Sequence, residues 1–311
     1  MIEMPELFER HMILGKQSFE ENEYEVAREH FEEAYNLKDD IKANVYLTKS
    51  LMALELYYEA YQVMSEKKAE FLLKEEYQEI YFNLLVKTKL LLEIEKFLIV
   101  TPSFKKTEWE KKYKVTKEYE LTINERKILE NEKELADISN VTPVRQPEFL
   151  KKIYYLPKER FMELAKNMLL DNKISFLIKS ELINQLTQLD INEPFNTVTW
   201  DGKIRTFIPN HHLPLKKMYE ENQVLNQIIE YFENSDPSLK EVVTSEVKLH
   251  LGCLYPFEIE EMQPAEKWVD SYLKKSEYSF EKEAVKEDLK EILSQQQKIE
   301  EQVMNSLLFH E

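Results

Sequence analysis

Glycine and cysteine are scarce in this sequence. Three glycines and one cysteine occur among 311 residues. So few glycines exclude the Gly-rich loops with which Walker-type and dinucleotide-binding proteins hold phosphates. The single cysteine, Cys253, excludes an internal disulfide and is typical of a reducing compartment. We therefore expect no nucleotide cofactor of these kinds.

Long apolar runs are also missing. The run Phe82-Asn83-Leu84-Leu85-Val86 ends at Lys87, far short of the roughly 20 residues that cross a bilayer as a helix. The chain does not open with a charged and then apolar leader. From these features we expect a cytoplasmic protein that does not bind a membrane.

Positive charge is in short supply. Acidic residues number 59 and basic residues 42, which gives a net charge of −17. Such a surface repels phosphate backbones and anionic lipids. The local exception is a group of lysines between residues 105 and 117 that alternates with Phe104, Trp109 and Tyr113. This pattern can bind single-stranded nucleic acid, but neighbouring glutamates cancel much of the charge, so we expect no nucleic-acid partner.

A short pattern recurs in the first hundred residues. Tyr24-x-x-Ala27-x-x-x-Phe31-x-x-Ala34 is followed 33 residues later by Tyr57-x-x-Ala60-x-x-x-Met64. A period of this length is typical of helical-hairpin solenoids, in which each hairpin buries its apolar face against its neighbours. In the first hairpin, Gly15 and Ala27 are the small residues expected at the close approach of the two helices.

A third unit keeps the large apolar residues of the pattern but not the small ones. The large positions are Ile80, Leu84, Leu90 and Phe97. Tyr81 and Glu93 stand where the small residues are expected. The pattern therefore predicts three hairpins, the third of them degenerate.

Residues 5–100 resemble the tetratricopeptide repeat (TPR) family through Leu14-Gly15, Tyr24, Ala27, Phe31 and Ala34. The resemblance implies a solenoid whose first helices line a concave groove that binds a protein or peptide. Carried over residue by residue, the implied groove positions are Met12, Lys16, Phe19, Val45, Lys49, Met52, Gln78, Phe82 and Leu85. Met12, Lys16 and Tyr46 replace the Lys, Asn and Asn with which some relatives clamp a terminal carboxylate, so that role is not implied.

Proline marks the end of the repeats and a second boundary. Thr101-Pro102 ends the repeat region, and 141–147 holds two prolines in an extended connector. Between them, Thr122-Ile123-Asn124-Glu125 has the spacing of a capping box and predicts a helix over 123–138. We predict repeats over 1–100, a helical junction over 101–147 and a second domain over 148–311.

The second domain carries one strand signal among helical periodicities. Asp201-Gly202 lies between two β-prone runs, which predicts a β-hairpin at about 196–208 with a type I′ turn. Helical spacing covers the rest of the domain, with predicted helices over 157–170, 174–189, 215–233, 237–252, 264–275 and 281–308.

A second resemblance covers about residues 145–275. Its motifs are Phe176-x-x-Lys179-Ser180-x-Leu182, Ile208-Pro209, Leu213-Pro214 and Leu254-Tyr255-Pro256-Phe257-Glu258. As a set they are similar to an uncharacterised group of TPR-containing cytoplasmic proteins of Gram-positive bacteria. This resemblance implies a fold and a compartment, and it carries no catalytic residues.

Catalytic and metal-binding interpretations find little support. His211-His212 and His250-x-x-Cys253 offer metal-ligand atoms, but no CxxC or HExxH spacing accompanies them. Cys253 lies among leucines, a setting that raises a thiol pKa. We expect no catalytic residue, no metal and no cofactor, and hence not an enzyme.

Together these features predict an all-α protein in which a TPR-like solenoid precedes a second helical domain with one small β-hairpin. The predicted function is an interaction adaptor or scaffold that binds a protein or peptide partner. The alternative is a peptide-sensing regulator that binds a short peptide in the repeat groove.

Overall fold

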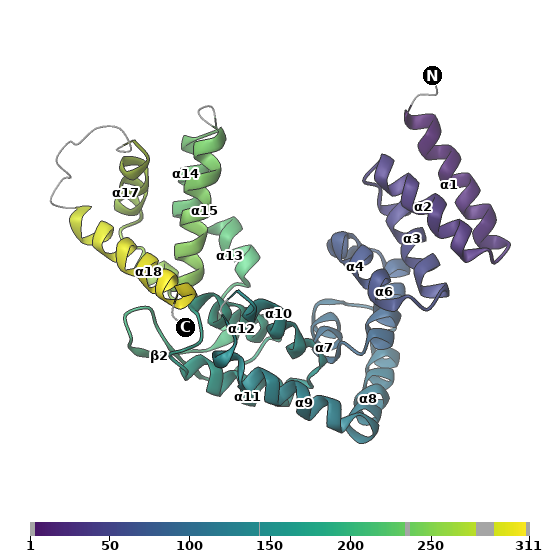
Figure 1. Cartoon of the computed structure of the whole chain (residues 1–311), viewed down its shortest axis with the longest axis horizontal. Coiled ribbons are helices and arrows are strands. Elements are labelled where there is room, and N and C mark those ends of the chain that lie inside the picture. The colour runs from purple at the N-terminus through teal and green to yellow at the C-terminus, as the bar shows by residue number, and fades with distance from the viewer. Residues whose placement is uncertain (1–3, 143, 234–236, 278–288, 309–311) are drawn as a thin grey trace. The chain divides into compact units, whose positions relative to one another are not determined.

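The protein is mainly helical in the computed structural model, which describes residues 4–142, 144–233, 237–277 and 289–308 (Figure 1). The chain divides into two compact units. Unit 1 comprises Met1–Ile128 and Tyr154–Lys158, and unit 2 comprises Leu129–Ile153 and Glu159–Glu311. The predicted all-α class with one small hairpin is confirmed. Within the described ranges, no helix combines the length and apolarity of a membrane span.

Unit 1 is a stack of helical hairpins. The helices of the three hairpins are α1 (Met4–Glu20) with α2 (Tyr24–Leu37), α3 (Ile41–Ala53) with α4 (Tyr57–Glu66), and α6 (Glu75–Thr88) with α7 (Leu91–Val100). A short helix, α5 (Lys68–Leu73), precedes the third hairpin, and α8 (Lys106–Ile123) packs on α6 and α7. Each hairpin packs on the next through the contacts of α2 with α3 and of α4 with α6.

The same backbone turn closes all three hairpins. Asn22, Glu55 and Lys89 have φ values of 62°, 61° and 60°. The amide of the following residue donates to a carbonyl five residues earlier, for example Leu56 N to Leu51 O at 2.9 Å. This hydrogen bond and a left-handed residue form the Schellman motif that ends many helices. The third hairpin therefore keeps the repeat backbone although its small residues are replaced.

Buried charge replaces small residues in the third hairpin. Glu93 is 4% exposed and forms ion pairs with Lys96 and, at 2.8 Å, with Lys68 of α5. The Lys68 ammonium also lies 6.0 Å from the ring centroid of the buried Tyr81. Burial opposes ionisation of Glu93, but the two ammonium groups hold its pKa below the usual value. The short helix α5 thus supplies an ammonium group that pairs with the buried Glu93 carboxylate of the third hairpin.

Helix α8 closes the α6 end of the stack. Its Trp109 is buried and stacks on Phe82, with ring centroids 5.4 Å apart, and Tyr113 is buried beside it. Two aromatics of the basic stretch are therefore core residues, whereas Phe104 is 80% exposed.

The predicted capping box is wrong. Thr122 lies inside α8, where its Oγ1 donates to the Glu118 carbonyl at 2.7 Å. The hydroxyl is therefore satisfied one turn back in its own helix and does not cap the next one. The following helix, α9 (Glu125–Ala136), begins after Asn124.

Unit 2 is organised around one long helix, α15 (Pro237–Leu254), which contacts α12, α13, α14, α16, α17 and α18. The other helical elements of the second half are η1 (Ile138–Asn140), α10 (Gln146–Leu150), η2 (Lys151–Tyr155), α11 (Lys158–Leu170), α12 (Phe176–Gln188), η3 (Pro209–His211), α13 (Leu215–Glu221), α14 (Gln223–Tyr231), α16 (Glu258–Glu261), α17 (Ala265–Glu277) and α18 (Lys290–Leu308). Large buried side chains such as Trp268, Tyr272 and Phe161 form its core.

One predicted helix is divided into two in the structure, and another is described only in part. The predicted 215–233 helix is interrupted at Asn222, whose Oδ1 accepts a hydrogen bond from Leu225 N at 3.0 Å and so caps α14. Helix α18 begins at Lys290, and residues 281–288 of the predicted last helix lie outside the described residues.

The predicted β-hairpin is present, but its turn differs from the prediction. Strand β1 (Phe195–Val198) pairs antiparallel with β2 (Ile204–Phe207), with Val198 opposite Ile204. Thr199 N donates to Lys203 O at 2.8 Å, which leaves a three-residue loop. Gly202 has φ 79°, whereas Asp201 does not have positive φ. A type I′ turn needs both, so this loop instead places Trp200 and Asp201 at the centre of the turn and Gly202 at the left-handed position.

Candidate functional site

A cluster of basic and aromatic side chains lies on the first helices of hairpins one and two. We call it the Tyr46 face; it comprises Lys16 and Phe19 of α1 with Tyr46, Lys49 and Met52 of α3. The Lys16 and Lys49 ammonium groups lie 5.2 and 5.4 Å from the Tyr46 ring centroid. Both lysines therefore make cation–π contacts with one ring.

The core beneath fixes the Tyr46 ring. Tyr46 stacks on the fully buried Phe31, with centroids 5.0 Å apart and planes inclined by 18°. Phe19 meets Tyr46 edge-on at 6.5 Å. Because Phe31 is a repeat residue held against Gly15, the position of the face follows directly from the packing of the first hairpin.

Neither lysine of the Tyr46 face forms an ion pair with a carboxylate of the described chain. Other lysines of unit 1 are paired: Lys67 lies 2.5 Å from Asp39, and Lys68 pairs with Glu93. In a protein with a net charge of −17, two ammonium groups beside one aromatic ring thus lack a carboxylate partner in the described chain.

The other implied groove positions are core residues. Met12, Val45, Gln78, Phe82 and Leu85 are all buried. Trp109 of α8 covers Phe82, and the Gln78 side-chain amide donates to the Leu72 carbonyl at 2.7 Å. For Gln78 and Phe82 the physical reason is that α5 and α8 pack on surfaces that a regular solenoid leaves open.

Lys16, Phe19, Lys49 and Met52 thus form the accessible part of the implied groove. Tyr46 also belongs to this site, although it is not among the groove positions implied by the TPR resemblance. An aromatic residue three positions before Lys49, and so on the same helix face, was the signal in the sequence.

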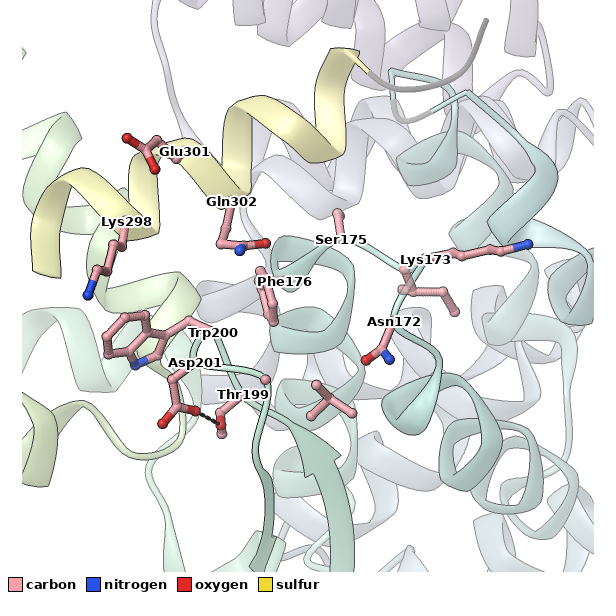
Figure 2. A pocket seen from close by; sticks show the side chains of 13 residues that line it. Asn172, Lys173, Ser175, Phe176, Thr199, Trp200, Asp201, Lys298, Glu301 and Gln302 are labelled. Atoms are coloured by element: carbon pink, nitrogen blue, oxygen red, sulfur yellow. Dashed lines mark hydrogen bonds between the residues drawn. The ribbon is translucent and has the colours of Figure 1, made fainter.

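Unit 2 contains a cavity of about 730 Å³ (Figure 2). Its walls come from the α11–α12 loop, the start of α12, the hairpin loop and α18, with lining residues Asn172, Lys173, Ile174, Ser175, Phe176, Val198, Thr199, Trp200, Asp201, Gly202, Lys298, Glu301 and Gln302. The volume lies in the range of small-molecule sites.

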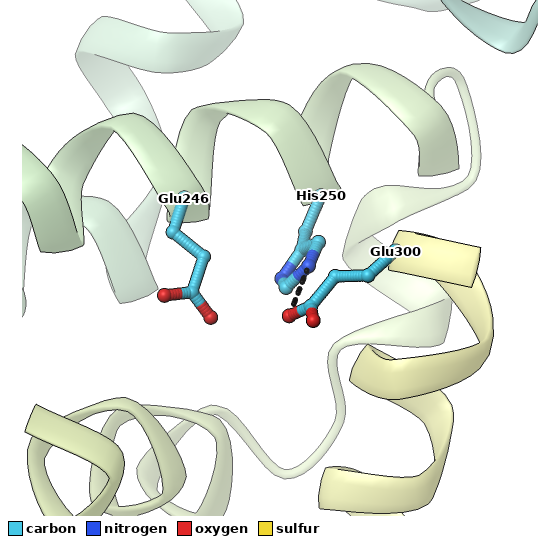
Figure 3. A group of neighbouring side chains, drawn as sticks. All are labelled: Glu246, His250 and Glu300. Carbon is cyan, nitrogen blue, oxygen red and sulfur yellow. Dashed lines mark ion pairs between the residues drawn. The ribbon is translucent and has the colours of Figure 1, made fainter. Parts of the chain in front are cut away.

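Glu246, His250 and Glu300 converge in unit 2 with a geometry that resembles a metal site (Figure 3). The Lys275 ammonium lies 2.7 Å from both carboxylates and supplies the positive charge there. Burial lowers the His250 pKa to about 4, an effect that Glu300 opposes and Lys275 reinforces. Tyr272 Oη lies 2.6 Å from His250 Nδ1. The arrangement is an ion-pair network around a neutral imidazole.

Cys253 does not have the chemistry of a nucleophile. It is buried, and burial raises the pKa of its thiol to about 12. A thiol with this pKa is protonated at neutral pH, and the thiolate is the reactive form.

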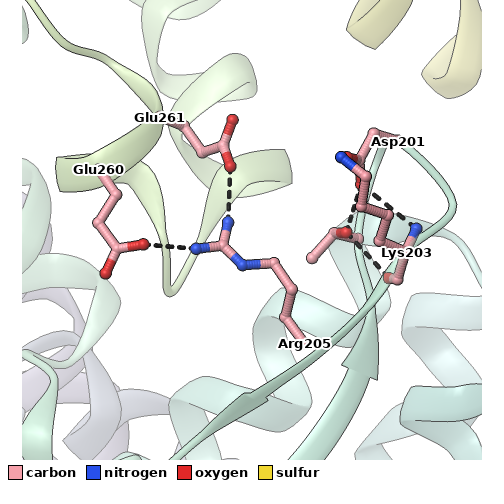
Figure 4. Close-up of polar contacts among 6 residues, drawn as sticks. Asp201, Lys203, Arg205, Glu260 and Glu261 are labelled. Carbon is pink, nitrogen blue, oxygen red and sulfur yellow. Dashed lines mark hydrogen bonds and ion pairs between the residues drawn. The ribbon is translucent and has the colours of Figure 1, made fainter.

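Tyr255 joins two motifs of the second resemblance, and Arg205 joins the β-hairpin to Glu260 and Glu261 (Figure 4). Tyr255 Oη donates to the Leu213 carbonyl at 2.8 Å. Arg205 of β2 pairs with Glu260 and, at 2.6 Å, with Glu261, while its guanidinium lies 3.8 Å from the Phe257 ring centroid. The contacts of Arg205 fasten the hairpin to the segment that follows α15, so the motif over residues 254–258 has a structural role.

Comparisons with known proteins agree with the repeat architecture. The chain is 24% identical over 284 residues to the TPR repeat-containing protein YsoA of Bacillus subtilis (strain 168), a match that covers 83% of this chain and 80% of the relative. Neither unit alone makes up that share, so the match includes parts of both. No protein-family model and no solved structure matches. The predicted resemblance to TPR-containing proteins of Gram-positive bacteria is confirmed.

Proposed function

We propose that this protein is an interaction adaptor that binds an acidic, partly apolar segment of a partner protein on the Tyr46 face. The observation that carries the proposal is the placement of Lys16 and Lys49 on one tyrosine ring without a carboxylate partner in the described chain. The similarity to a protein named for its TPR repeats supports a protein partner.

The chemistry of the face fits such a segment. Two ammonium groups orient carboxylates and speed encounter, an effect that falls with ionic strength. Phe19 and Met52 are partly buried and offer apolar area beside them. Tyr46 is held by Phe31, so it loses little conformational freedom on binding.

A peptide-display selection tests the proposal with defined ligands. Wild-type protein should enrich peptides that combine Asp or Glu with large apolar residues. The double variant Lys16→Glu/Lys49→Glu should lose this enrichment because both ammonium groups become carboxylates.

Lys111→Glu/Lys114→Glu is the matched control, since both of these lysines are exposed and lie on α8, outside the Tyr46 face. The control should retain the wild-type selection. Selection of peptides without acidic residues, or equal losses in the two double variants, would show that the Tyr46 face is not the binding surface.

The closed α6 end favours a second candidate, a regulator that senses a short peptide. Because Trp109 covers Phe82, the open surface is confined to α1 and α3, which suits a short ligand. A sensor must also transmit binding. Hydrogen exchange in unit 2 should then change when a selected peptide binds, whereas an adaptor should show changes near α1 and α3 alone.

A further inference from the structure

Unit 2 contains a buried lysine that lacks an anionic partner. Lys179 of α12 is 3% exposed, and no hydrogen bond or ion pair joins its ammonium to a described residue. The ammonium lies over the ring of Phe176, 5.5 Å from its centroid. Asp171 acts on it from the preceding loop through a longer-range charge interaction.

Burial of an unpaired ammonium group is unfavourable. Such a group gives up hydration and gains no compensating acceptor. The buried lysine of unit 1, Lys96, is instead paired with Glu93. A methionine at position 179 would fill similar volume without the charge, so packing alone does not explain a lysine there.

Lys179 lies behind the wall of the 730 Å³ cavity. It lines a second cavity of about 10 Å³, room for roughly one water molecule. The two cavities share Phe176, Val198, Thr199 and Trp200. The two cavities therefore adjoin at these four residues, and Lys179 lines the smaller one.

The start of α12 adds hydrogen-bond donors to the same wall. Ser175 caps the helix by accepting from Ile178 N at 3.3 Å. The first amides of a helix lack carbonyl partners in the helix and favour an anion. Ser180 Oγ, adjacent to Lys179, is buried without a partner in the described chain.

The charged side chains that line the cavity favour an anion near the start of α12. Lys173 and Lys298 add positive charge. Asp201 is already engaged, because Lys203 Nζ lies 2.6 Å away and Thr199 Oγ1 donates to it at 2.6 Å. Glu301 accepts from Gln297 at 2.8 Å and lies on α18.

Aromatic side chains supply the rest of the surface. The hairpin loop places Trp200 on the wall, and Phe176 stands at the start of α12 (Figure 2). We propose that this cavity binds a small carboxylate or phosphate with an aromatic body, with its anion toward Lys179 and the start of α12 and its ring against Trp200 and Phe176.

Two aromatic anions, 1-naphthoate and phenyl phosphate, test the site against their neutral counterparts, 1-naphthamide and phenol. At millimolar concentration at least one anion should raise the melting temperature and quench the fluorescence that Trp200→Phe removes. The neutral counterparts should do neither. The anion that binds better distinguishes a carboxylate ligand from a phosphate ligand.

Lys179→Met should weaken binding of the anion at least tenfold, while Lys216→Met, a change on the exposed surface of unit 2, should leave it unchanged. The Lys179→Met protein is expected to fold, because the substitution removes an unpaired buried charge. Failure of both anions to bind, equal binding of neutral compounds, or full affinity in Lys179→Met would overturn the proposal.

Discussion

The ring of Phe31 occupies the space that a side chain on Gly15 would need. A Cβ atom at Gly15 would lie 2.8 Å from Phe31 Cε1, and two further ring atoms would lie 2.9 Å away. Phe31 in turn supports Tyr46 by stacking. The absence of a side chain at Gly15 thus determines how closely α2 approaches α1, and through Phe31 it determines where the Tyr46 face lies.

Gly15→Val should therefore overpack the first hairpin. The fully buried Phe31 has little room to move, and overpacking costs about 1–3 kcal/mol of unfolding free energy. Urea denaturation measures the change. Gly252→Ala is the control. A Cβ atom at Gly252 would lie 3.2 Å from the Tyr219 hydroxyl and 3.5 Å from Leu177, which are longer distances than those at Gly15. An unchanged midpoint for Gly15→Val would contradict the packing described for this hairpin.

Glu93→Gln should destabilise unit 1 because Lys68 and Lys96 lose their shared carboxylate. Removal of one member of a buried ion pair costs about 3–5 kcal/mol. The folded pKa of Glu93 lies below the ordinary value of 4.5. The stability that its carboxylate contributes is therefore present above pH 4.5 and is lost as the pH falls through the folded pKa.

Denaturation at neutral and acidic pH checks this prediction. The gap between wild type and Glu93→Gln should narrow as the pH falls below 4.5. Asp39→Asn, which removes an exposed partner of Lys67, should have little effect. Equal stability of wild type and Glu93→Gln at neutral pH would show that the cluster contributes nothing to the fold.

Lys179→Met should stabilise unit 2 at neutral pH. Burial lowers the Lys179 pKa from 10.5 to about 8, so between these values the unfolded chain binds more protons than the folded one. Wild-type stability should rise with pH across that window, by an amount on the order of 1–3 kcal/mol, and the rise should be absent in the variant. Thermal melts across this pH window provide the measurement. A less stable variant at neutral pH would mean that Lys179 has an anionic partner within the fold.

Lys275→Met should raise the pKa of His250. Burial holds this pKa at about 4, with the Lys275 charge acting in the same direction and Glu300 against it. Loss of the ammonium leaves the two carboxylates facing the imidazole. Wild-type stability is lost as the pH falls from 6.5 toward 4, because the unfolded histidine binds a proton that the folded one does not.

NMR titration of the His250 ring protons measures this change directly. In the variant, His250 should titrate at a higher pH than in the wild type. The variant should be less stable than the wild type at neutral pH, and its stability should fall less steeply as the pH is lowered. Lys240→Met, on the same helix α15, is the control. A His250 pKa that is unchanged or lower in Lys275→Met would exclude this electrostatic explanation.

The amino-acid sequence alone was sufficient to predict the helical hairpins and the place of the β-hairpin. Spacings such as Tyr24, Ala27 and Phe31 act within one hairpin, where neighbours in sequence are neighbours in space. The dipeptide Asp201-Gly202 located the turn for the same reason. The turn type was not determined, because the pairing of Thr199 with Lys203 decides which residues form the loop.

The accessibility of individual side chains, by contrast, depends on tertiary packing. Phe82 occupies an implied groove position, yet Trp109, 27 residues later in the sequence, covers it. Lys16 and Lys49 meet only because α1 and α3 place both beside Tyr46. Lys179 has a polar side chain, yet it is buried in unit 2 beside a cavity. Local periodicity sets which face of a helix is apolar, but burial and charge pairing depend on the distant segments that pack against that face.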